Sequence, residues 1–289
     1  MQGPTTRFDS LLARGNTSDV YAVGADAVVK VPRPGVPVHW TDVEAELASA
    51  AHDLGLPTPM VLDVIDVAGR RSIVFERVEG PSMAEELVAS PQRCDEMARS
   101  MAAVQTDFHR AIAPDSMPTV ADRVSEKIAG ADELGVDERA SASELLGGLD
   151  GGTSICHGDV HPGNILVGAQ GLMVIDWFDA AAGPPIADIV RSSLLLRLAG
   201  RPPAVPSYLV DVPAATLERF HATYLQQMLP VLLDDPGVTL TWEVVRSVAR
   251  LSEKLDAGAA DLVAIWRSRC DVTGAPDTPL ANLVCGGSG

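Results

Sequence analysis

The stretch ICHGDVHPGNIL, residues 155–166, decides how this chain is interpreted. It places Asp159 and, five residues later, Asn164 on a tight polar segment between two apolar runs. The stretch MVIDW, residues 173–177, follows almost at once and ends a buried apolar strand in the carboxylate of Asp176. The sequence therefore predicts a turn that carries an Asp and an Asn, followed by a strand that ends in a second Asp.

This layout is the one that phosphoryl transfer requires. One Asp accepts the proton of an attacking hydroxyl, while an Asn and a second Asp hold Mg²⁺ on the phosphates of ATP. In kinase catalytic loops a His precedes the catalytic Asp by two residues and the metal-binding Asn follows it by five. His157 and Asn164 stand at those distances from Asp159. We therefore predict that Asp159 is the catalytic base and that Asn164 and Asp176 are Mg²⁺ ligands.

The form His-Gly-Asp-x-His-x-x-Asn, followed by Ile-Asp-Trp, resembles the aminoglycoside phosphotransferase family of antibiotic and other small-molecule kinases. Protein kinases have Asp-Phe-Gly where this chain has Asp-Trp-Phe. The resemblance implies an α+β, bilobal, protein-kinase-like fold. It assigns an antiparallel sheet and one helix to an N-lobe, residues 1–77. A mostly helical C-lobe with the catalytic loop and the acceptor-binding region spans residues 78–285, and residues 286–289 are expected to be a flexible tail.

The first part of the N-lobe, residues 7–31, is predicted to consist of strands. A polar turn at residues 14–19 precedes a strand, and a second strand ends near Lys30. In a kinase-like lobe such a turn covers the phosphates and the lysine grips them. The resemblance implies that the hydroxyl of Ser18 helps to hold a phosphate.

Residues 41–54 are predicted to form a helix that supplies a partner for Lys30. A kinase-like site needs a Glu there to hold the lysine against the α and β phosphates. Glu44 matches the family position, and Glu46 is the alternative. A third interpretation remains open, because Thr41 and Glu44 also form the pattern of a capping box at a helix start.

A hairpin is predicted next, with strands at residues 60–67 and 72–78. The resemblance makes its end the hinge between the lobes. Adenine of the nucleotide, ATP or GTP, would bond there to backbone groups near Glu76 and Val78.

The remaining chain is predicted to be mostly helical. Helices are expected over residues 82–112 with a break near Pro91, over 119–147 as one helix or two, over 212–229 and over 241–263. By resemblance, Asp188 braces the catalytic loop, and His109 is structural.

In the last of these helices, six apolar residues form a core stripe, and seven charged residues are expected to face solvent. The charged residues are Glu243, Arg246, Arg250, Glu253, Lys254, Asp256 and Asp261. Trp242 and Trp266 are alternatives for stacking on an acceptor ring.

The amino-acid composition indicates which classes of binding partner the protein favours. The chain has 22 Lys and Arg against 39 Asp and Glu, a formal charge of −17. Such a charge disfavours nucleic acid and anionic membranes and favours cationic partners. Four scattered cysteines predict neither a disulfide framework nor a zinc site, which fits a reducing cytoplasm. Neither a signal peptide nor a membrane span is predicted.

Taken together, these features predict an ATP-dependent phosphotransferase that acts on a hydroxyl of a small molecule. The favoured acceptor is a cationic antibiotic such as an aminoglycoside, which the enzyme would inactivate. A macrolide or a metabolite such as choline, homoserine or a ketosamine is the alternative acceptor, and a nucleotide-binding pseudoenzyme is a further alternative. The protein is expected to be a monomer or a homodimer.

Overall fold

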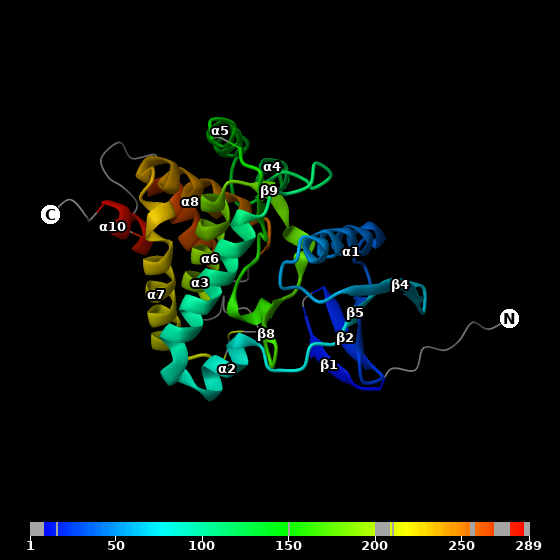
Figure 1. Ribbon diagram of the computed structural model, residues 1–289. Helices are drawn as coiled ribbons and strands as arrows, with labels where there is room; N and C mark the ends of the chain where they lie inside the picture. The colour runs from blue at the N-terminus through cyan, green and yellow to red at the C-terminus, as the bar shows by residue number, and fades with distance from the viewer. Residues whose placement is uncertain are drawn as a thin grey trace. The chain divides into compact units, whose positions relative to one another are not determined.

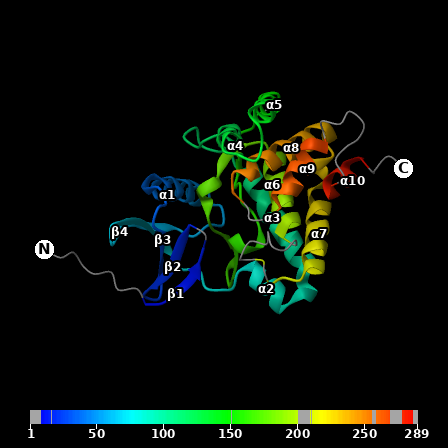
Figure 2. The same cartoon turned by 180° about the vertical axis from the view of Figure 1, so that it is seen from behind.

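The structure is a computed structural model that describes residues 9–15, 17–149, 151–199, 209, 211–254, 258–268 and 278–285. The predicted tail at 286–289 lies outside the described residues. The elements are labelled in Figure 1 and are seen from behind in Figure 2. Among the described helices, none combines the length and apolarity needed to cross a membrane.

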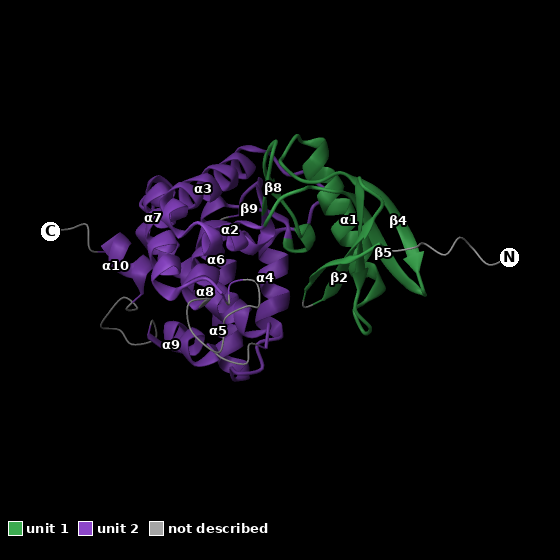
Figure 3. Cartoon of the chain, turned by 90° about the horizontal axis from the view of Figure 1, so that it is seen from below, with its two compact units in different colours: residues 1–81, 166–179 green, residues 82–165, 180–289 purple. Residues whose placement is uncertain are grey.

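The chain divides into two compact units (Figure 3). The first unit comprises residues 1–81 and 166–179, and the second comprises residues 82–165 and 180–289. The lobe boundary between residues 77 and 78 stays a prediction.

The first unit is built on a five-stranded antiparallel sheet with the order β1-β2-β3-β5-β4. Its strands are β1 (Leu11–Arg14), β2 (Ser18–Val23), β3 (Ala27–Pro32), β4 (Val61–Val67) and β5 (Arg70–Glu76). Val29 and Val31 of β3 are buried with Val67 in an apolar cluster, so the residue between the two valines points to the opposite face of the strand. The predicted strands and hairpin are confirmed for the described residues.

Helix α1 (Val38–Asp53) packs against β4 and β5. Its buried stripe includes Thr41, Glu44, Ala48 and Ala51, which recur at helical spacing. The stripe therefore turns the carboxylate of Glu44 inward rather than toward solvent.

A later segment completes the first unit. Strands β7 (Ile165–Gly168) and β8 (Gly171–Val174) pair as a two-stranded sheet, and the short helix η3 (Trp177–Asp179) follows. The N–H of Val174 donates to the carbonyl of Pro57 at 2.7 Å. This bond fixes the strand end that leads to Asp176.

The second unit is mostly helical. Its elements are α2 (Met83–Ala89), η1 (Pro91–Arg93), α3 (Cys94–Arg110), α4 (Val120–Ala129), α5 (Val136–Gly147), β6 (Ser154–Cys156), η2 (Pro162–Asn164), β9 (Ala181–Gly183), α6 (Pro185–Ala199), α7 (Ala214–Leu232), α8 (Pro236–Leu251), α9 (Ala259–Ser268) and α10 (Pro279–Cys285). Helix α6 packs against α7 and α8, and α3 packs against α7. The short β6 pairs with β9 and leads into the turn that carries Asp159.

The prediction of one helix over residues 241–263 is wrong. Helix α8 begins five residues earlier, where the side chain of Asp235 caps it by accepting from the N–H of Val238. It ends at Leu251, and α9 starts only at Ala259. The backbone between them takes left-handed conformations, with φ of 49° at Lys254 and 89° at Gly258, which an α-helix does not permit.

The polar face predicted for that helix is also wrong in part. Glu243, Arg246 and Arg250 are 2%, 5% and 1% exposed, so they are buried rather than solvated. Charged residues reach full burial mainly when they are paired. Glu243 is paired with Arg197 of α6 at 3.3 Å, and Arg246 donates to the carbonyl of Ala187. Trp242 and Trp266 are buried as well, in the core of this unit.

Candidate active site

The predicted catalytic turn follows a buried strand. Ile155 and Cys156 of β6 are fully buried, and the chain then turns at Gly158, whose φ of 81° favours glycine. Asp159 comes directly after that turn. The 3₁₀ helix η2 then brings Asn164 back toward Asp159.

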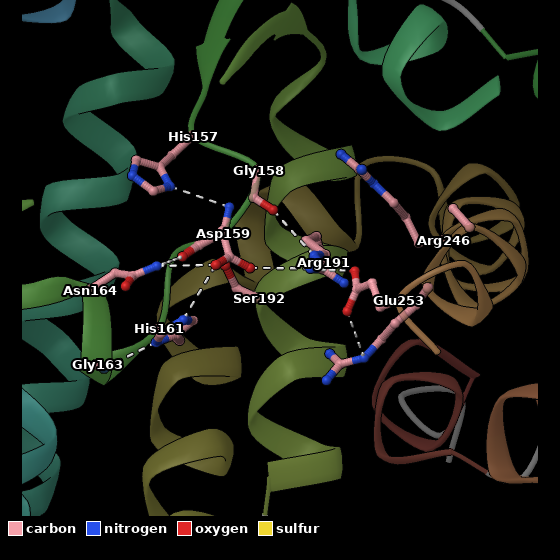
Figure 4. A network of polar contacts seen from close by, with 12 residues as sticks. His157, Gly158, Asp159, His161, Gly163, Asn164, Arg191, Ser192, Arg246 and Glu253 are labelled. Atoms are coloured by element: carbon pink, nitrogen blue, oxygen red, sulfur yellow. Dashed lines mark hydrogen bonds and ion pairs between the residues drawn. The ribbon is translucent and has the colours of Figure 1, made fainter. Parts of the chain in front are cut away.

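Both carboxylate oxygens of Asp159 are engaged (Figure 4). Oδ1 accepts from Nη2 of Arg191 at 3.1 Å, and Oδ2 accepts from Nδ2 of Asn164 at 3.1 Å. Nε2 of His161 lies 3.4 Å from Oδ2. Burial by itself would raise the pKa of Asp159, but the contacts with His161 and Arg191 outweigh it and hold the pKa well below its ordinary range. Asp159 is therefore a fixed anion with a defined orientation.

The two histidines of the turn act as acceptors for its backbone. Nδ1 of His157 accepts from the N–H of Asp159 at 3.2 Å, and Nδ1 of His161 accepts from the N–H of Gly163 at 3.0 Å. A neutral imidazole that accepts at Nδ1 carries its proton on Nε2. In His161 this proton faces Asp159, so His161 also holds the carboxylate in place.

Asp188 braces the turn, as predicted. It is fully buried, and it accepts from the N–H groups of Gly158 at 2.7 Å and His157 at 3.3 Å. Gln105 and His109 of α3 donate to the same carboxylate at 2.8 and 3.1 Å. Burial would raise the pKa of Asp188, but the bonds from His109, Gln105 and Gly158 lower it to about 2. The structural role expected for His109 is confirmed.

In the first unit, Lys30 lies between two carboxylates. Its Nζ is 2.5 Å from Oε1 of Glu44 and 3.1 Å from Oδ1 of Asp176. Glu44 is buried and the lysine is nearly so, with side chains 9% and 14% exposed. Burial by itself would lower the pKa of Lys30, but Asp176 and Glu44 outweigh it and raise the pKa above its usual range. Lys30 is therefore held as a cation beside Asp176.

Among the partners considered for Lys30, Glu44 is the one that the structure selects. Glu46 is exposed on the opposite side of the helix. The capping-box interpretation is wrong, because α1 begins at Val38 and Thr41 lies inside it. The hydroxyl of Thr41 instead donates to the carbonyl of Arg71 at 3.2 Å.

The other residues predicted to contact the nucleotide all lie in the first unit. Ser18 is buried at the start of β2, where its carbonyl accepts from the N–H of Gly15 at 2.8 Å. Glu76 ends β5, and its N–H is donated to the carbonyl of Met60 at 2.9 Å. Val78 follows that strand end. The nucleotide contacts of these three residues stay predictions.

The sequence profile described as the phosphotransferase enzyme family matches residues 10–231. This chain belongs to that family. It is a small-molecule kinase, and its fold is the kinase-like α+β fold that was predicted.

Solved structures share the fold of this phosphotransferase. Apo aminoglycoside phosphotransferase APH(4)-Ia, as a thermostable mutant, has a TM-score of 0.62 and 17% identity over 98% of this chain and 96% of its own. ADP-bound APH(2'')-Ib has a TM-score of 0.54 and 18% identity over 91% and 92%. The streptomycin-ATP complex of APH(2'')-IIa has a TM-score of 0.55 and 18% identity over 91% and 95%. A comparison with curated proteins finds no match.

Sequence reasoning missed three residues of the polar network around the predicted catalytic turn. Arg191 and Gln105 have no motif of their own, and Glu253 was assigned to a solvated face. A signal for Arg191 was present, since it follows Asp188 by three residues on α6 and so shares its face. Nothing comparable marks Gln105, whose partner Asp188 is 83 residues away.

Proposed function

We propose that this phosphotransferase transfers the γ-phosphoryl group of ATP to a hydroxyl of a cationic antibiotic, with an aminoglycoside as the favoured acceptor. The observation that carries the proposal is the carboxylate of Asp159, fixed on both oxygens within a braced turn. The formal charge of −17 adds a general preference for a cationic acceptor. Solved relatives of the same fold are complexes with hygromycin B, streptomycin and gentamicin.

In the proposed reaction, Asp159 orients the acceptor hydroxyl. The hydroxyl oxygen forms a bond to the γ-phosphorus, the bond from that phosphorus to the ADP oxygen breaks, and the hydroxyl proton passes to Asp159. A carboxylate with a strongly depressed pKa is a weak base, so its main contribution is orientation. That suits a loose transition state, in which positioning and charge neutralisation supply most of the rate.

We assign nucleotide binding to residues of the first unit. Lys30 would grip the phosphates, with Glu44 holding it in place, and the hydroxyl of Ser18 would add a donor. Since the N–H of Glu76 is already donated to Met60, the adenine would use the carbonyl of Glu76 and the backbone of Val78.

Asn164 and Asp176 have the donor chemistry that Mg²⁺ requires. Nδ2 of Asn164 donates to the carbonyl and the carboxylate of Asp159, so its oxygen points elsewhere (Figure 4). Asp176 stands on a left-handed backbone with φ of 68°, and its side chain is 42% exposed. Two hard oxygen donors leave the remaining positions to phosphate oxygens and water, as Mg²⁺ prefers. When bound, the ion would neutralise negative charge on the phosphates.

The test is ADP release from ATP by the purified protein in the presence of aminoglycosides, basic peptide antibiotics, macrolides and amino alcohols. We expect aminoglycosides to support turnover and Asp159→Asn to lower it about 10²- to 10⁴-fold while ATP binding persists. Asp107→Asn is the control, because that carboxylate is exposed in the same unit. Acceptor-independent ADP release, or near-normal turnover by Asp159→Asn, would refute the proposal. Growth protection by the expressed enzyme tests the antibiotic role in cells.

A further inference from the structure

A buried arginine connects the catalytic turn to the end of helix α8. Arg191 of α6 is 5% exposed. Its Nη2 donates to Oδ1 of Asp159 at 3.1 Å, and its Nε donates to the carbonyl of Gly158 at 3.2 Å. One guanidinium therefore binds both the backbone and the side chain of the turn (Figure 4).

The same Nη2 also contacts a second carboxylate. Nη2 of Arg191 lies 2.7 Å from Oε1 of Glu253, just beyond the end of α8. Oε2 of Glu253 lies 3.8 Å from Nε of Arg250, which is itself buried. Two carboxylates and two guanidinium groups thus alternate in the order Asp159, Arg191, Glu253 and Arg250. Their charges cancel, which lets four ionised groups share a poorly hydrated site.

The contacts on Asp159 are distributed over both of its carboxylate oxygens. Asn164 and His161 contact Oδ2, whereas Arg191 contacts Oδ1. The carboxylate is planar and turns about its Cβ–Cγ bond, so contacts on both oxygens resist that rotation from two sides. Without the donor on Oδ1, the contacts on Oδ2 alone would hold the plane in which a lone pair can receive a hydroxyl proton.

We propose that Arg191 is a positioning residue for phosphoryl transfer and that Glu253 holds Arg191 in its working orientation. This inference rests on the proposed role of Asp159. Arginine suits the task because its planar fork makes several directed bonds at once, which a single ammonium group does not reproduce. Glu253 thereby links the turn to the C-terminal helices, although it makes no contact with Asp159 that the structure records.

The test is a kinetic comparison of Arg191→Met, Arg191→Lys, Glu253→Gln and the double variant Arg191→Met/Glu253→Gln. Arg191→Met should lower kcat about 10²-fold with KM for ATP changed less than about twofold, because misplacement of a reacting group acts on the chemical step. Arg191→Lys should fall between wild type and Arg191→Met. Glu253→Gln should lower kcat about tenfold, and the double variant should be no slower than Arg191→Met, because the two residues act through one contact.

Arg197→Met is the matched control. Arg197 lies on the same helix, is nearly buried, and pairs with a buried glutamate of α8, Glu243, at 3.3 Å. Its loss should lower the urea midpoint while leaving kcat within about twofold of wild type, because it acts away from the turn. An equal kcat for Arg191→Met and Arg197→Met, or additive losses in the double variant, would overturn the inference.

Crystal structures separate this inference from the proposed function. If the wild-type enzyme phosphorylates no acceptor, the proposed function fails, and the position of Asp159 still tests the inference. A rotated Asp159 carboxylate in Arg191→Met and Glu253→Gln supports the positioning role, and an unmoved carboxylate in both overturns it. If Arg191→Met does not fold, Glu253→Gln gives the same readouts with both arginines retained.

Discussion

Replacing Asp188 by Asn tests the hydrogen bonds that brace the predicted catalytic turn. The substitution keeps the shape of the side chain and removes its charge. In the native protein Oδ1 accepts from the N–H of Gly158, while Oδ2 accepts from Gln105, His109 and the N–H of His157. The least disruptive amide orientation keeps an oxygen toward the three donors and turns its NH₂ toward Gly158.

The magnitude follows from these contacts. The amide of the Asp188→Asn variant would lose one 2.7 Å bond to a charged acceptor and leave a buried N–H facing another donor. A bond to a charged group contributes about 1.5–3 kcal/mol, and an unsatisfied buried donor adds about 1–3 kcal/mol. The depressed pKa gives a second estimate, since a fall from 3.8 to about 2 corresponds to about 2 kcal/mol of preference for the anion. We therefore expect a loss of about 3 kcal/mol of unfolding free energy at pH 7.

The assays are urea unfolding and phosphoryl-transfer kinetics. At neutral pH Asp188→Asn should unfold at lower urea, and its kcat should fall about 10²-fold because the turn shifts. Ser192→Ala is the control. That hydroxyl accepts from Gln105 at 3.2 Å in the same network. Its loss should cost about 1 kcal/mol and leave kcat nearly unchanged.

The pH dependence of the free energy of unfolding gives a result that could refute this prediction. Because the pKa of Asp188 is lower in the folded protein, its stabilisation is complete above the unfolded value of 3.8 and is lost as the pH falls toward 2. The stability difference between wild type and Asp188→Asn should therefore narrow below about pH 4. A difference that stays constant from pH 5 to 3, or a normal kcat in the variant, would show that the charge does not brace the turn.

Three further outcomes are expected. Gly171→Ala should lower the free energy of unfolding in urea by about 1–3 kcal/mol, because alanine disfavours the positive φ at that position. Gly80→Ala should cost more, because its Cβ would also stand 2.1 Å from a carbonyl oxygen of β7. Equal losses in the two variants would contradict this reasoning. Lowering the pH from 7 to 4 should reduce the free energy of unfolding by about 3 kcal/mol through His221. Burial lowers the pKa of His221 from 6.5 to about 4 in the folded protein, so the unfolded chain takes up the proton first. In His221→Gln the free energy of unfolding should depend less steeply on pH over this range, and an unchanged dependence would contradict the prediction. Glu44→Gln should weaken ATP binding about tenfold in titration calorimetry, because Lys30 loses its nearest carboxylate. Glu46→Gln is the control, since Glu46 is exposed and its loss should leave ATP binding unchanged.

The sequence alone determined the local features of this phosphotransferase. The spacing of Asp159 and Asn164, and the strand that leads to Asp176, follow from short-range patterns of apolar and polar residues. The antiparallel strands of the first unit and most helices of the second could be predicted for the same reason. Lys30 was predicted as the phosphate lysine because it ends the strand that follows the polar turn of a kinase-like N-lobe.

Only the tertiary structure decided which charged side chains meet. It selected Glu44 over Glu46, placed Arg191 between Asp159 and Glu253, and buried three charged residues of α8 that helical periodicity assigned to solvent. Periodicity reports which residues share a face, but it does not report whether another helix covers that face. The physical reason is that an ion pair is fixed by packing between elements far apart in the chain, and no local pattern encodes such a partner.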